Sequence, residues 1–501
     1  MTNQFDELKI RLMEIYDLQH AGFLLSWDEA TYMPPGGAPA RGRQTALLAR
    51  LAHEKSIDPA IGRLLDELRA YQESLPYESD DASLIRVARR EYERAIKIPP
   101  KFMAEFYEHS SRSYNTWVTA RPENNFKALE PLLERTLDLS RQMADFFPGY
   151  EHIADPLIDF ADYGMKATTL RSLFAQLRRE LIPIVQAITS QPPANDSCLK
   201  KTYPQADQLA FGLEVIRQLG YDFNRGRQDL TPHPFTTEFS VGDVRITTRV
   251  RENDLSDSLF STIHEAGHAM YEQGVRMELE GTPLATGTSA GVHESQSRTW
   301  ENLVGRSRGF WEYFYPKLQA KFPDQLKGVS LDTLYRAVNK VQRSLIRTDA
   351  DEVTYDLHVM IRFDIELALL EGNLLVRDLP EYWHLRYNAD MGIRAPDDRD
   401  GVMQDVHWFG GTVGGAFQGY TLGNIMGSQF FAQALKTHPE IPQEMSQGKF
   451  DTLHTWLIDN VYQHGSKFTA NELIERVTGG PLSIEPYINY LKTKYGELYQ
   501  L

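Results

Sequence analysis

Residues 261–271 read Ser-Thr-Ile-His-Glu-Ala-Gly-His-Ala-Met-Tyr, and the rest of the chain is best interpreted around this stretch. It contains His264-Glu265-x-x-His268, and on a helix residues four apart share one face, so both imidazoles can point at one spot. Two imidazoles beside a carboxylate suit a metal-dependent hydrolase, in which the histidines bind the ion and the glutamate acts as a base toward water. The pattern is short and also occurs by chance, so the remaining sequence has to support it.

The residues before this stretch predict a hairpin followed by a helix. A helix over 256–273 would bury one apolar stripe, with Asp254 or Ser256 as its N-cap. Over residues 237–250 the apolar period falls to two, and Gly242-Asp243 interrupts it, which is typical of a β-hairpin. This is the only clear strand signal in the chain, and it lies directly before the predicted helix.

Elsewhere the apolar residues recur at the three- and four-residue spacing of helices. Prolines and glycines divide the pattern into segments, and we expect the first helix to end at a turn cluster over residues 26–37. The other predicted helices cover residues 40–54, 58–75, 80–97, 100–120, 124–146, 166–190, 204–219, 290–304, 310–321, 331–345, 351–371 and 420–436. No repeat and no linker interrupts them, so we expect one mainly α domain over residues 1–501.

The composition argues against several classes of protein. The formal net charge of the 501 residues is −16, whereas non-specific nucleic-acid binding needs clustered lysine and arginine. The only cysteine, Cys198, allows neither an intrachain disulfide nor a thiolate-rich metal site. The N-terminus lacks a secretory pattern, and no apolar run approaches the ~20 residues that cross a bilayer. We therefore expect a cytoplasmic protein without a membrane segment.

A catalytic zinc needs three protein ligands and one open position. The metzincin pattern is excluded, because Tyr271 and Gly274 stand where that class has glycine and histidine. A carboxylate on a following helix is the alternative, and Glu294 lies 26 residues after His268, an interval that fits a helix, a loop and a second helix. Glu294 could instead only pair with Arg298. Its rivals as a ligand are Glu272, Glu278, Glu301 and His293.

The remaining steps of peptide hydrolysis suggest three further candidates. Glu265 would accept a proton from the attacking water and pass it to the leaving amine. The oxyanion that develops needs a donor besides the metal, and His407 or Tyr420 could supply one. For each of these two, the sequence alone favours a buried polar residue with a purely structural role.

Cleavage at the carboxyl end of a peptide also needs a cation for the terminal carboxylate. Arginine suits this task because its planar fork matches a carboxylate. Arg347 lies between two long predicted helices, in a segment rich in polar residues. The alternative is an intrahelical ion pair with Asp351, four residues further on, and composition does not choose between the two.

Seven short motifs occur in a fixed order through nearly the whole chain. They are Trp27-Asp28-x-x-Thr31-x-Met33-Pro34 with Arg41 and Gln44, His233-Pro234-Phe235, Asp243-Val244-Arg245-Ile246-Thr247-Thr248, His264-Glu265-Ala266-Gly267-His268, His293-Glu294-Ser295-Gln296-Ser297-Arg298, Ile346-Arg347-x-x-Ala350-Asp351-Glu352 and Gly401-x-x-Gln404-Asp405-x-His407-Trp408. Each is weak alone, but together they resemble the motifs of the carboxypeptidase Taq family of zinc metallocarboxypeptidases.

The resemblance implies several properties that spacing does not show. It matches Glu294 to the third zinc ligand, Arg347 to the arginine that holds the substrate carboxylate, and His407 and Tyr420 to residues lining the cleft. It implies one zinc ion per chain, which cobalt can replace, and the release of single C-terminal residues of many types but poorly of proline. It also implies a homodimer and a helical fold like those of neurolysin and angiotensin-converting enzyme, in which two lobes flank a deep groove and a small antiparallel sheet lies beside the active-site helix.

Two positions depart from the family pattern. Val250 stands where the family often has tyrosine, and residues 414–420 read Gly-Gly-Ala-Phe-Gln-Gly-Tyr where the family often has an additional ring. We expect the extra glycines to loosen this wall of the groove and to change the substrate preference.

Taken together, these observations predict a zinc metallocarboxypeptidase that acts on peptides with a free C-terminus. One alternative is an oligoendopeptidase on the same scaffold, which would cut inside short peptides. A second is a helical binding protein without catalysis, which the intact set His264, Glu265, His268 and Glu294 disfavours.

Overall fold

The computed structural model describes residues 2–501, which are mainly α-helical. The first half contains α1 (Thr2–Thr31), α2 (Ala38–Ser56), α3 (Pro59–Glu67), α4 (Arg69–Ser74), α5 (Asp80–Lys97), α6 (Pro100–Ala120), α7 (Phe126–Asp145), α8 (Asp155–Ala161), α9 (Ala167–Thr189) and α10 (Gln205–Leu219). The second half contains α11 (Leu255–Gln273), α12 (Ala290–Arg298), α13 (Arg308–Lys321), α14 (Leu331–Val338), α15 (Tyr355–Leu370), α16 (Leu379–Met391), α17 (His407–Gly410), α18 (Gln418–Thr437), α19 (Ile441–Ser446), α20 (Asp451–Asn460), α21 (Ala470–Thr478) and α22 (Glu485–Tyr499).

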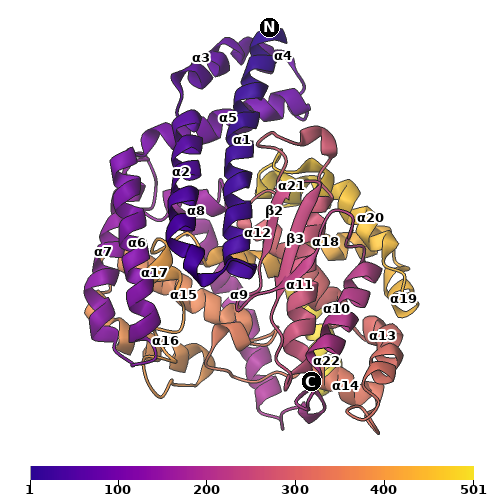
Figure 1. Ribbon diagram of the computed structural model, residues 1–501. Helices are drawn as coiled ribbons and strands as arrows, with labels where there is room; N and C mark the ends of the chain where they lie inside the picture. Colours follow the sequence, from indigo (N-terminus) through magenta and orange to yellow (C-terminus); the bar gives the residue numbers. More distant parts are fainter. Residues whose placement is uncertain (1) are drawn as a thin grey trace.

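A small three-stranded sheet follows α10 in the chain and precedes α11. Its order is β1 (Gln228–Leu230), β3 (Asp243–Thr248), β2 (Thr236–Ser240). β2 and β3 form the predicted antiparallel hairpin, whereas β1 pairs with β3 in parallel. Val244 and Ile246 on β3 are buried, and both β2 and β3 pack on α11, which follows them in the chain. The sheet therefore supports the helix that carries the His-Glu motif (Figure 1).

Two apolar clusters hold the molecule together. The larger joins helices from α6 to α22 around α11, α15 and α18. The smaller is formed by α1, α3 and α5 with a few residues of the loops after β2 and α11. Figure 1 shows α1 and α2 as a long pair of helices beside the sheet, and α1 contacts β2. Across residues 2–501, no helix combines the length and the apolar character needed to cross a membrane.

The predicted mainly helical fold is confirmed, and several helices have the predicted bounds. The helices expected at 80–97 and 100–120 coincide with α5 and α6 residue for residue. Ser79 caps α5 through a hydrogen bond to the backbone N–H of Ala82, and the Pro99-Pro100 pair separates the two helices. At both boundaries the local chemistry agrees with the tertiary structure.

The end of the first helix was predicted wrongly. Residues 26–31 were expected to lie in a turn, but α1 continues to Thr31. Trp27 is buried, and Arg41 from α2 binds both the Leu25 carbonyl and the Asp28 carboxylate. These contacts with a distant segment hold the last turn helical and outweigh its weak local signal.

Other elements also differ from the expectation. The segment 58–75 divides into α3 and α4, the helix expected over 331–345 ends at Val338, and the next long helix begins at Tyr355. The short elements α8 and β1, together with α16, were not predicted. β1 has three residues, too few to show a period of two.

Close packing of α11, α12 and α18 brings the site residues together. A Cβ atom on Gly267 would lie 2.7 Å from the Ser297 Cα on α12. A Cβ on Gly423 of α18 would lie 2.4 Å from the Glu294 Cγ. Only glycine allows these approaches, so α11 and α18 both pack closely against α12. This packing places Glu294 beside the His-Glu motif.

Candidate metal centre and active-site groove

His264 and His268 on α11 and Glu294 on α12 form a group that could hold a metal ion. Their ligand atoms all lie within 4.8 Å of one another. The Glu294 Oε2 atom is 3.7 Å from the His264 Nε2 and 3.4 Å from the His268 Nε2. Two imidazoles and one carboxylate leave a position open at a four-coordinate ion, so the donor set suits a catalytic metal.

The outer nitrogens of both imidazoles are held by further side chains. The His264 Nδ1 lies 2.9 Å from a carboxylate oxygen of Glu301, and the His268 Nδ1 lies 2.6 Å from the His293 Nδ1. The His293 Nε2 in turn lies 2.6 Å from Glu272. Such partners fix the orientation of ligand rings around metals in proteins, so the arrangement fits a bound ion.

Three rivals of Glu294 are therefore placed around the candidate ligands. Glu301 and His293 contact the outer nitrogens, and Glu272 contacts His293. Glu278 is exposed on the short helix η3 (Met277–Leu279), outside the group. Glu301 lies on η4 (Thr299–Val304), which continues α12 as a π-helix. π-Helical turns are wider than α-helical ones and are often found at functional sites.

The geometry of Glu294 is compatible with both roles considered for it from the sequence. Its Oε1 accepts a hydrogen bond from the Arg298 Nε at 2.7 Å, while its Oε2 faces the two histidines. Burial opposes its ionisation, but the Arg298 charge and the histidines outweigh this and hold the pKa of Glu294 well below its usual value. The carboxylate is thus anionic, as a metal ligand must be.

Glu265 lies on the same helix but outside the group of candidate ligands. It is buried, and its Oε2 accepts a hydrogen bond of 2.7 Å from the Thr236 hydroxyl on β2. Burial raises the pKa of Glu265 above its usual value. A carboxylate that is costly to keep charged and is fixed by a neighbouring strand is suited to accept a proton.

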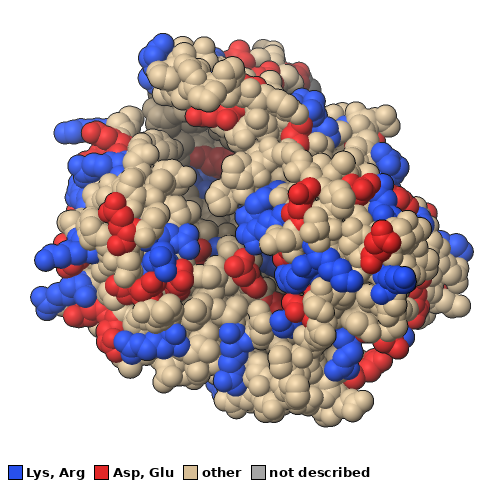
Figure 2. Space-filling model, turned by 60° about the horizontal axis from the view of Figure 1, so that its bottom comes forward, with Lys and Arg blue, Asp and Glu red and all other residues tan. Residues whose placement is uncertain are grey.

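One groove, with a volume of about 870 Å³, is lined by the three candidate ligands His264, His268 and Glu294 and by Glu265. The same groove is lined by Arg347 and Tyr420, and Figure 2 shows a hollow on one face of the molecule with charged side chains around it. His407 does not line the groove directly but contacts Tyr420, with 3.1 Å between the His407 Nε2 and the tyrosine hydroxyl. Burial lowers the pKa of His407 to about 4, so its imidazole is neutral near pH 7.

Arg347 lies on the 3₁₀ turn η5 (Arg347–Asp349) and is buried. Its Nε and Nη2 atoms donate to the Asp405 carboxylate at 3.1 and 2.8 Å, and its Nη1 donates to the Tyr355 hydroxyl at 2.9 Å. The alternative ion pair with Asp351 does not form, since Asp351 accepts backbone N–H groups at the start of α15. Asp405 also accepts a hydrogen bond from the buried Arg362, so one carboxylate lies between two arginines.

The glycine-containing segment before α18 is not loosened as expected. Gly414 and Gly415 have φ values of +95° and +90°, which favour glycine. A Cβ on Gly415 would lie 2.3 Å from the Leu157 carbonyl oxygen, and Phe417 is fully buried. The glycines let the chain pack tightly against α8, so the expectation of a looser wall was wrong.

Three contributors to this site could not be recognised from the sequence. Thr236 reaches Glu265 from a strand, Tyr355 reaches Arg347 from the next helix, and Asp405 lies 58 positions after Arg347. Neither period nor spacing connects such pairs, because the chain brings them together only when it is folded. The Gln-Asp-x-His pattern at 404–407 was the one available signal for Asp405.

Comparisons with known proteins point to one family of metallopeptidases. The family model of carboxypeptidase Taq (M32) metallopeptidases matches residues 7–495. Thermostable carboxypeptidase 1 of Thermus thermophilus is 42% identical over 492 residues, with 96% of both chains covered, and carboxypeptidase 1 of Bacillus subtilis is 36% identical, with 99% of this chain and 98% of the relative covered. The crystal structure of an M32 carboxypeptidase from Deinococcus radiodurans superposes with a TM-score of 0.96 at 49% identity and covers 100% of both chains.

Proposed function

The chain belongs to the carboxypeptidase Taq (M32) metallopeptidase family and is a metallocarboxypeptidase, and from this premise we propose that it uses zinc to release single amino acids from peptide C-termini. The observation that carries the proposal is that the His264, His268 and Glu294 group and the buried Arg347 line the same groove. One part of the groove can hold a catalytic ion, and another carries a fixed positive charge for a carboxylate.

Zinc suits this donor set because two imidazoles and one carboxylate form a known type of catalytic zinc site. When bound there, the ion would polarise the scissile carbonyl and lower the pKa of the attacking water. Glu265 would accept the proton of the attacking water and deliver it to the leaving amine. Tyr420 would donate a hydrogen bond from its hydroxyl to the developing oxyanion, with the neutral His407 holding the ring in place.

Arg347 would set the position of the cut by holding the substrate's terminal carboxylate. Its contacts with Asp405 and Tyr355 use the Nε atom and one hydrogen on each of Nη1 and Nη2. An arginine has five N–H donors, so one remains on each Nη atom. These two donors match a carboxylate in a paired geometry, and the contacts of the other three keep the guanidinium from moving.

Amidation of the substrate tests the carboxypeptidase register. We expect a peptide with a free C-terminus to lose residues one at a time, and its C-terminal amide to be cleaved at least about tenfold more slowly, because the amide removes a charge-assisted contact. Mass spectrometry of timed digests would follow both peptides. Equal rates, or fragments from internal cuts, would favour an oligoendopeptidase instead.

Metal analysis tests the choice of zinc. We expect about one zinc ion per purified chain, loss of hydrolysis on chelation, and its return with zinc or cobalt. Manganese found in place of zinc, with no recovery of activity on adding zinc, would contradict this choice.

The finer specificity is also part of the proposal. Following the resemblance, we propose broad acceptance of C-terminal residues except proline, two lobes that flank the groove, a homodimer and a cytoplasmic location. Digests of a peptide series that differs only in the last residue would measure which C-terminal residues are accepted. Light scattering of the purified chain would measure whether it is a homodimer.

A further inference from the structure

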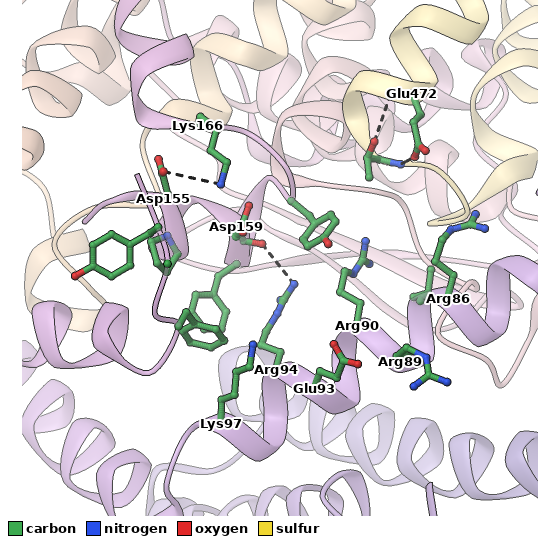
Figure 3. A pocket seen from close by; sticks show the side chains of 18 of the residues that line it. Arg86, Arg89, Arg90, Glu93, Arg94, Lys97, Asp155, Asp159, Lys166 and Glu472 are labelled. Atoms are coloured by element: carbon green, nitrogen blue, oxygen red, sulfur yellow. Dashed lines mark hydrogen bonds and ion pairs between the residues drawn. The ribbon is translucent and has the colours of Figure 1, made fainter. Parts of the chain in front are cut away.

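A second cavity, of about 610 Å³, shares no lining residue with the metal groove. Its walls come from one face of α5, from residues 147–166, which include α8, and from the start of α21 (Figure 3). We call it the arginine cavity. Its volume is in the range that encloses a small organic ligand.

Basic side chains follow the α5 face of the arginine cavity. Arg86, Arg90 and Arg94 are four residues apart and share one side of the helix, and Lys97 extends the row. A planar guanidinium that lies on a ring still presents its N–H edge to a ligand. The distance from the arginine Cζ to the ring centroid is 3.9 Å for Arg86 over Tyr77, 4.5 Å for Arg90 over Tyr163 and 5.1 Å for Arg94 over Phe160. The Lys97 Nζ lies 5.4 Å from the centroid of the Phe147 ring.

Two of these arginines lack the partners that their neighbours have. Arg86 donates to two carbonyl oxygens and a hydroxyl, and Arg89 donates to Asp66. Within residues 2–501, the buried Arg90 Nε has no hydrogen-bond partner. Arg94 makes one long contact, 3.4 Å, with the backbone oxygen of Asp159. A buried arginine donor is normally paired, so the Arg90 Nε and the weakly held Arg94 guanidinium together could bind an anion.

The charge of the cavity supports the same conclusion. Seven basic and four acidic side chains line it, although the chain as a whole carries −16. Three of the carboxylates hold the walls: Asp155 binds backbone N–H groups of His152 and Ala167, Asp159 binds that of Gly164, and Glu472 caps α21. Burial and repulsion from Arg90 lower the pKa of Arg94, although the nearby carboxylates of Glu91 and Asp159 act in the opposite direction.

The cavity also contains apolar surface that is open to solvent. Phe160 and Tyr163 are 40% and 41% exposed, although each is covered on one side by an arginine. Accessible rings beside these arginines form a surface that suits a ligand with both an anionic and an apolar part. A ligand with a charged head and a flat body would satisfy both.

We propose that the arginine cavity binds a small phosphate monoester, with its phosphate between Arg90 and Arg94 and its apolar group against Phe160 and Tyr163. Two neighbouring guanidinium groups match a dianion better than the single charge of a carboxylate. Phosphate also has enough oxygens to accept from both forks at once. The site is separate from the catalytic groove, so its occupancy does not depend on the proposed peptidase mechanism.

Calorimetric titration of the metal-loaded enzyme with phenyl phosphate tests this proposal, with inorganic phosphate and phenylacetate as comparison probes. We expect phenyl phosphate to bind at one site, inorganic phosphate more weakly and phenylacetate most weakly. The double variant R90Q/R94Q should bind phenyl phosphate at least about tenfold more weakly, because charge-assisted contacts are lost. The matched control is R89Q on the same helix, since the Arg89 guanidinium pairs with Asp66 and points away from Arg90 and Arg94 (Figure 3).

Each other result would overturn the proposal. Equal binding by the wild type and R90Q/R94Q would place the ligand elsewhere, for example at the metal. Equal affinity for phenylacetate would show that the cavity does not select phosphate. The single variant R94Q, checked by thermal unfolding and by unchanged peptide hydrolysis without phosphate, provides the same comparison if the double variant does not fold.

Discussion

Replacing Glu265 with glutamine should reduce the turnover of C-terminal residues by about 10²–10⁴-fold while leaving the metal bound. Glutamine has the same shape and can still accept the hydrogen bond from the Thr236 hydroxyl, but it cannot take a proton from water. Because Glu265 lies outside the group formed by His264, His268 and Glu294, the ion should remain. Steady-state kinetics with metal analysis of the same sample measures both.

The control for Glu265→Gln is Glu278→Gln. Glu278 follows α11 and is exposed, so the same chemical change there should leave turnover and metal content within about twofold of the wild type, because surface substitutions have small effects. Full activity of Glu265→Gln would show that another group accepts the proton. Loss of the metal would instead assign Glu265 to the ligand sphere.

Replacing Asp405 with asparagine should lower the free energy of unfolding by about 3–5 kcal/mol, because it leaves Arg347 and Arg362 without their shared counter-ion. The two arginine charges hold the pKa of Asp405 far below its usual value despite its burial, so the carboxylate is anionic between them. Arg347 should also lose its fixed orientation. We therefore expect a higher KM for peptides with a free C-terminus and a smaller change for amidated ones, measured beside denaturant unfolding.

Asp66→Asn is a matched control for Asp405→Asn, because Asp66 also bridges two arginines, Arg69 and Arg89. Its side chain is 67% exposed, whereas that of Asp405 is 10% exposed. Solvent screens the exposed pairs, so the control should leave the denaturant midpoint of unfolding close to that of the wild type. If both substitutions had equally small effects, the buried Asp405 cluster would not be what orients Arg347.

Much of the helical pattern could be predicted, because local chemistry and tertiary packing agree at most boundaries. The capped start of α5 and the Pro99-Pro100 break are examples. The predictions failed where distant contacts decide the outcome. The last turn of α1 is held by Arg41 of another helix, and β1 is a strand only because β3 lies beside it.

The candidate site follows the same division. His264, Glu265 and His268 are placed by the period of one helix, so the sequence alone brings them together. Glu294 was one of several carboxylates at a possible interval, and spacing could not separate it from Glu301. Packing through Gly267 and Gly423 turns Glu294 toward the histidines, while Glu301 reaches the far side of the His264 ring.

The sequence by itself therefore determined the helical class, the hairpin before α11 and the motif that carries the candidate ligands, because each depends on neighbours within about one or two turns of the chain. Only the tertiary structure decided that Asp405 binds Arg347, that Gly415 packs against α8, and that Arg90 and Arg94 line one cavity. These features depend on the close approach of segments far apart in the chain, and side-chain volume and buried charge settle that approach only in the folded molecule.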